Sequence, residues 1–152
     1  MNKSPTQIRD LTYQWLIVLF CVLTLTGCSV KLISSYDERT DQNVTALQKK
    51  VATFFVKVGS QVGLPECKYD NHVNFYQETK VDISAIEMRA RAIPKNEITI
   101  EQVQLLKSSL NSLEQLHQLG CFTENQVINL QSNFDTHLTA ILKLELAKKR
   151  GD

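Results

Sequence analysis

Apolar residues recur at helical spacing in the segment that follows residue 40. The steps between them alternate between three and four residues, as on one face of a helix, and the positions are Val44, Leu47, Val51, Phe54, Val58 and Val62. Ser35 and Glu38 have the spacing of a capping box at the start of this segment. Pro65 cannot continue a helix, so the pattern predicts a helix that ends between Gly59 and Gly63.

A second helical pattern extends from about Tyr69 to Ile93, and Pro94 follows it directly. Its apolar face is formed by Tyr69, Val73, Tyr76, Ile83, Ile86, Ala90 and Ile93. Arg89 and Arg91 lie near the end of the segment, where the helix dipole favours cations. We therefore expect a helix that ends just before the proline.

Two further helices are predicted in the last third of the chain. Thr99 with Gln102 and Thr123 with Gln126 have capping-box spacing and mark their expected starts. Gly120 is suited to end the first of the two helices. Their apolar faces are formed by Val103, Leu106, Leu110, Leu113 and Leu116, and by Val127, Leu130, Phe134, Leu138, Ile141 and Leu144.

Alternation typical of strands is nowhere sustained, and the chain has only 5 Gly and 3 Pro. Helices joined by short loops prefer antiparallel neighbours. The sequence therefore predicts an all-α fold, an antiparallel up-down-up-down four-helix bundle formed by residues 36–150.

The beginning of the chain has another pattern. Lys3 and Arg9 precede an apolar run over residues 15–23, which is shorter than the roughly 20 residues that a spanning helix needs. A basic start, a short apolar run and small residues after it are typical of a secretory signal peptide. The alternative interpretation is a short uncleaved anchor helix in which Cys28 has no special role.

The residues that end this segment, Leu25-Thr26-Gly27-Cys28, resemble the lipobox of bacterial lipoproteins. The resemblance implies cleavage just before Cys28 and attachment of diacylglycerol to its thiol. The residue after Cys28 is Ser29, whereas some lipoproteins have Asp there. In this respect the chain resembles lipoproteins that are sent to the outer membrane. We expect a signal peptide at 1–27, a lipidated tether at 28–35, and a bundle that faces the periplasm from the outer membrane.

The start of the expected bundle, Tyr36-Asp37-x-x-Thr40-Asp41, resembles small helical lipoproteins of Gram-negative bacteria. This resemblance implies no functional residue.

Cys67 and Cys121 are the cysteines that remain after Cys21 is removed with the signal peptide and Cys28 is lipidated. An even number of cysteines in an oxidising compartment indicates a disulfide. In an up-down-up-down bundle the first and third loops lie at the same end, and these loops contain the two residues. The predicted disulfide and the predicted topology therefore support each other.

The net charge and the short motifs bear on whether the chain binds nucleic acid, binds metal or catalyses a reaction. The formal charge of +1 provides no strong basic field for nucleic acid. Glu114-x-x-His117 occurs once, whereas a di-metal bundle needs such pairs on facing helices. His72 and His117 are both expected near the disulfide, and they are interpreted as partly packed boundary residues. We therefore expect no enzymatic activity, no cofactor and no metal.

Two adjacent aromatic pairs, Phe54-Phe55 and Phe75-Tyr76, offer a candidate partner surface. Neighbours on a helix cannot both point to the core centre, so Phe55 and Phe75 are candidates for that surface. The alternative is a wide core stripe. The functional hypothesis is a non-catalytic interaction, adaptor or inhibitor-like protein with a protein partner in the envelope. The alternative is a carrier of a small ligand or metal in the bundle core or tip.

The lipidation hypothesis depends on Cys28. Substitution Cys28→Ala removes the thiol that forms the thioether, so acyl labelling should be abolished and uncleaved precursor should accumulate in the inner membrane. Metabolic labelling with a radioactive fatty acid, followed by electrophoresis, measures both effects. Unchanged labelling and processing in the variant would contradict the hypothesis.

Overall fold

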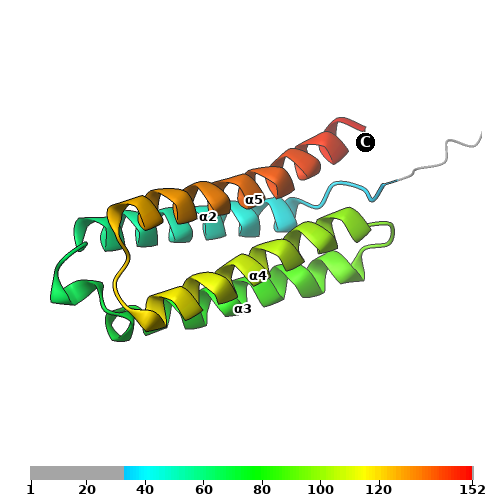
Figure 1. Ribbon diagram of the computed structural model, residues 1–152. Helices are drawn as coiled ribbons and strands as arrows, with labels where there is room; N and C mark the ends of the chain where they lie inside the picture. The colour runs from blue at the N-terminus through cyan, green and yellow to red at the C-terminus, as the bar shows by residue number, and fades with distance from the viewer. Residues whose placement is uncertain (1–32, 152) are drawn as a thin grey trace, which may run out of the picture. The chain divides into compact units, whose positions relative to one another are not determined.

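The computed structural model describes residues 33–151, and within this range every regular element is helical. The long helices are α2 (Glu38–Ser60), α3 (Val73–Ala92), α4 (Glu97–Leu119) and α5 (Glu124–Gly151). Two short 3₁₀ turns, η1 (Pro65–Cys67) and η2 (Tyr69–Asn71), lie between α2 and α3. The expectation of an all-α chain with four helices is confirmed for this part of the protein (Figure 1). None of these helices is both long enough and apolar enough to cross a membrane.

Each long helix packs mainly on two neighbours. α2 contacts α3 and α5, and α4 contacts the same two helices, so the four helices surround one core. The core contains the predicted apolar faces, and its largest fully buried side chains include Tyr76, Phe55, Phe134, Leu47 and Leu110. The bundle is therefore held together by the apolar faces that the sequence pattern identified.

Two sets of contacts fasten the ends of the bundle. A disulfide joins Cys67, in η1, to Cys121, just before α5, with the Cα atoms 5.4 Å apart. This confirms the predicted pairing. Elsewhere, the Ser34 N–H donates to the Lys95 carbonyl at 2.9 Å, which ties the segment before α2 to the α3–α4 connection. Figure 1 shows the segment between α2 and α3 at one end of the helices and the α3–α4 connection at the other.

The helix starts agree with the predicted capping boxes in one case and differ in two. Thr123 and Gln126 form the predicted box, with reciprocal hydrogen bonds of 2.8 and 3.3 Å. The cap of α2 is Asp37, not Ser35, because the Asp37 carboxylate accepts the Thr40 N–H at 3.0 Å. Thr99 lies inside α4 and is fully buried. Its hydroxyl bonds to Glu145 and Lys148 of α5, so it does not cap α4.

α3 begins later than the sequence predicts. The pattern placed its start near Tyr69, but residues 65–71 form two 3₁₀ turns and α3 starts at Val73. Pro65 favours such a turn because its fixed φ fits a first helical position. Tyr69 still packs against the core and its ring lies 5.4 Å from that of Tyr76. An apolar position can therefore match the helical period without belonging to the helix.

Phe55 belongs to the core, which corrects its assignment to a partner surface. It is 1% exposed and its ring lies 5.7 Å from that of Phe134. Phe54 is also buried and stacks on Phe75, with ring centroids 3.9 Å apart. Successive positions on a helix differ by about 100°, and α2 has a neighbour on each side. One phenylalanine thus faces α5 and the other faces α3.

This arrangement predicts different costs for the two substitutions. Phe55→Ala should destabilise the fold by about 3–5 kcal/mol because it leaves a cavity against Phe134. Phe75→Ala, at a partly exposed position, should cost about 1 kcal/mol. Urea unfolding of both variants measures the difference, with Phe134→Ala as the core control. Equal free energies of unfolding for the two variants would contradict this assignment.

Candidate functional site

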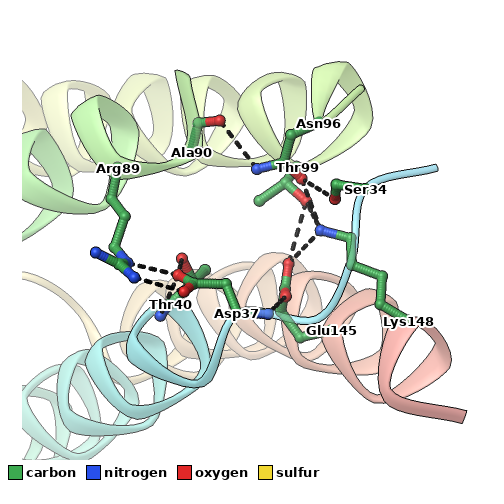
Figure 2. A network of polar contacts seen from close by, with 9 residues as sticks. All are labelled: Ser34, Asp37, Thr40, Arg89, Ala90, Asn96, Thr99, Glu145 and Lys148. Atoms are coloured by element: carbon green, nitrogen blue, oxygen red, sulfur yellow. Dashed lines mark hydrogen bonds and ion pairs between the residues drawn. The ribbon is translucent and has the colours of Figure 1, made fainter. Parts of the chain in front are cut away.

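A buried polar network lies at the end of the bundle where the described chain begins (Figure 2). At its centre lies the ammonium of Lys148, a residue that is only 3% exposed. It donates to Asn96 Oδ1 at 2.6 Å, to Thr99 Oγ1 at 2.8 Å and to Glu145 Oε1 at 2.6 Å. An ammonium has three N–H donors, so every donor of Lys148 is used.

The other members of this network are also paired. Thr99 donates its hydroxyl hydrogen to Glu145 at 3.2 Å. The Asn96 amide nitrogen donates to the Ala90 carbonyl at 3.0 Å, and its oxygen accepts the Ser34 hydroxyl at 2.9 Å. A fully paired buried network makes a structure rigid. It connects the N-terminal segment, the α3–α4 connection and α5.

An ion pair extends this network toward α2. Arg89 donates from two nitrogens to the two Asp37 carboxylate oxygens at 2.5 and 2.6 Å (Figure 2). The Arg89 guanidinium is the main cause that lowers the pKa of Asp37 to about 2, and the Thr40 hydrogen bonds act in the same direction. Asp37 therefore stays ionised while it caps α2.

At the disulfide end, His117 is 1% exposed and links α3, α4 and η1. Its Nε2 is 2.6 Å from the Cys67 carbonyl, and its Nδ1 is 2.7 Å from the Tyr76 hydroxyl. A carbonyl can only accept, so Nε2 bears the hydrogen and Nδ1 accepts from Tyr76. Burial lowers the pKa of His117, which favours this neutral form.

His72 lies beside His117, with ring centroids 5.3 Å apart. Burial lowers the pKa of His72, and the nearby His117 acts in the same direction. Its Nε2 is 3.2 Å from the Glu66 carbonyl. The histidines are thus more deeply packed than boundary residues would be, and both nitrogens of His117 are used by the protein. Within residues 33–151 no group of three or more His, Cys, Asp or Glu side chains could hold a metal.

An open groove of about 540 Å³ lies between the second half of α2 and the beginning of α3. We call it the α2–α3 groove. The α2 side is lined by Ala46, Lys49, Lys50, Thr53, Phe54 and Lys57, and the other side by Asn71, His72, Asn74, Phe75 and Glu78. The stacked rings of Phe54 and Phe75 therefore contribute to its lining.

The lysines of the α2–α3 groove differ in their partners. Lys50 forms ion pairs with Glu78 at 3.1 Å and with Asp82 at 2.7 Å. The exposed ammonium groups of Lys49 and Lys57 have no ion pair or hydrogen bond with any residue of 33–151. The groove therefore combines aromatic rings with two uncompensated positive charges.

The residues that the sequence analysis proposed as site residues do not come together in one site. Cys28 lies outside the described residues, Cys67 and Cys121 are joined, and Phe55 is in the core. Phe75 lines the groove together with Phe54 and His72. Neither the groove lysines nor the Lys148 network was predicted. A signal for the network existed, since residues 145 and 148 continue the apolar spacing of residues 138 and 141 but are charged.

The chain matches no protein-family model, no curated protein and no solved structure.

The network predicts a large effect of removing one partner. Lys148→Met leaves the Glu145 carboxylate buried without its cation, which should cost about 3–5 kcal/mol of stability. Lys148→Met combined with Glu145→Leu should be more stable than Lys148→Met alone because no buried charge remains. The free energy of unfolding in urea measures both variants.

The control for this prediction is Arg150→Met, at an exposed position two residues away. It should change stability by less than about 0.5 kcal/mol. If Lys148→Met lowered the free energy of unfolding no more than the control does, the ion pair would not be buried in solution.

Proposed function

We propose that this chain is a lipid-anchored envelope protein that binds another envelope protein and has an adaptor-like or inhibitor-like role without catalysis. The signal peptide, the lipidation of Cys28 and the outer-membrane location are parts of this proposal. The observation that most supports it is the difference between the two ends of the bundle. One end binds the N-terminal segment tightly, and an open groove lies near the other.

The fixed position of Ser34 makes the proposed tether short. Ser34 is six positions after Cys28, and an extended chain of that length spans at most roughly 20 Å. Because Ser34 is hydrogen-bonded to Lys95 and Asn96, the chain could not extend further without breaking buried contacts. The N-terminal end of the bundle would then lie close to the membrane.

The proposed topology is an antiparallel up-down-up-down bundle. Short connections between successive helices and the Cys67–Cys121 disulfide support it, because the first and third connections then share an end. This end, and with it the α2–α3 groove, would face away from the membrane. The molecule would act as a short spacer that presents a binding surface to the periplasm.

The polar side chains inside the bundle also favour a binding role over catalysis. His117, Glu145 and Lys148 direct their polar atoms to other groups of the protein. A catalytic group must instead be free to contact a substrate. The alternative role, as carrier of a metal or small ligand, has less support because the deepest histidine offers no free nitrogen.

Site-specific photo-crosslinking in cells tests the proposal. A photoreactive amino acid is placed at an exposed position on each helix: Thr53, Ser84, Ser112 or Thr136. An envelope partner should form a discrete adduct from at least one position, because crosslinking requires contact within a few ångströms. The Cys28→Ala form is the control, and it should lose the adduct if anchoring brings the partners together. Absence of a discrete protein adduct from all positions would contradict the proposal.

A further inference from the structure

We propose that the α2–α3 groove binds an extended acidic segment of a partner protein, with two carboxylates on either side of an apolar side chain. This inference rests on the proposed function and names the surface and the kind of partner.

The first argument is charge. Lys49 and Lys57 lie on the α2 side of the groove, and neither is neutralised by another residue of 33–151. Lys50 lies between them but is paired with Glu78 and Asp82. An anionic ligand would therefore meet two available cations, and the carboxylate of Glu78 is already compensated. Charge complementarity of this kind selects a partner and directs its approach.

The second argument is spacing. Lys49 and Lys57 are eight positions apart on α2, which corresponds to about 12 Å along a helix axis. An extended peptide advances about 3.3 Å per residue, so carboxylates about four residues apart match this interval. A single inorganic anion matches it poorly. The distance therefore favours a segment with two acidic side chains.

The third argument is the aromatic lining between the two charges. Phe54 and Phe75 are stacked with their ring planes 5° apart, and Phe75 is partly exposed on the groove side. An apolar side chain placed between the two carboxylates would cover this exposed ring and be removed from water. Contact with such a side chain would account for the partial exposure of Phe75.

The start of α3 adds to the preference for negative charge. His72 is its N-cap but makes no capping hydrogen bond with its side chain, and the first turn contains no acidic residue. The N–H groups at a helix start attract anions when no side chain compensates them. Both His72 and Asn74 line the α2–α3 groove. The helix start and the lysines thus favour the same charge on a ligand.

Fluorescence anisotropy with the full chain in detergent tests the inference. The probe is a labelled peptide with Glu at positions i and i+4 and Phe at i+2. It should bind more weakly as NaCl rises from 50 to 300 mM because added salt screens the charges. Matched peptides with Gln for both Glu, or with Ala for Phe, should bind at least tenfold more weakly.

Charge reversal locates the binding site. Lys49→Glu with Lys57→Glu should weaken binding of the acidic peptide at least tenfold. The control, Arg39→Glu with Lys143→Glu, makes the same charge change at exposed positions outside the groove and should change affinity less than twofold. Thermal unfolding confirms that both variants are folded. Equal losses in the two variants, or equal binding of the Glu and Gln peptides, would overturn the inference.

Binding to phosphatidylglycerol vesicles distinguishes a protein ligand of the groove from a lipid ligand. If the groove reversal abolishes vesicle binding but leaves peptide binding unchanged, the groove binds a lipid headgroup and the inference is wrong.

The crosslinking experiment then distinguishes the two proposals. An adduct from Thr53 that peptide mass spectrometry maps to an acidic segment of the partner supports both. An adduct from Ser112 or Thr136 alone supports the proposed function but overturns the assignment of the groove.

Discussion

Burial of one apolar face from each of four helices is the interaction on which the described structure depends. The helices surround a common core in which Leu47, Ile83, Leu110 and Leu138 are almost completely removed from water. Isolated helices of this length are marginal in water, so each helix depends on its two neighbours for stability. The width of each buried face follows from the same arrangement. Phe54 and Phe55 can both be buried because α2 has helices on two sides.

The two ends of the bundle are fastened by different chemistry. At one end a disulfide joins two connections, and the neutral His117 bridges Tyr76 to the Cys67 carbonyl. At the other end the Lys148 ammonium donates hydrogen bonds to oxygens of three residues. Breaking either set would expose apolar surface as well as unpaired polar groups. The N-terminal segment is held by the second set, and this is why the proposed lipid anchor and the bundle would be closely coupled.

The groove between α2 and α3 differs from these internal contacts because its charges are not balanced by the described protein. Elsewhere charges are paired, as in the partly exposed pair of Asp37 with Arg89 and the buried pair of Glu145 with Lys148. Lys49 and Lys57 instead lie beside aromatic rings and remain available. A surface that combines apolar area with uncompensated charge is suited to recognition, since the first favours association and the second selects the partner.

The sequence by itself determined the helical class, the apolar faces and the pairing of Cys67 with Cys121. These follow from local periodicity and from counting, which need no knowledge of distant neighbours. The capping box at Thr123 was predicted because its hydrogen bonds join residues three positions apart. Only the tertiary structure decided the roles of Thr99, Lys148 and Phe55. Lys148 also pairs with Glu145, three positions before it on α5. The partners that decided these three roles, however, are 46 positions away or more, so local pattern could not identify them. The groove likewise depends on how α2 and the start of α3 are placed relative to each other. The periodicity within one helix contains no information on the position of another helix.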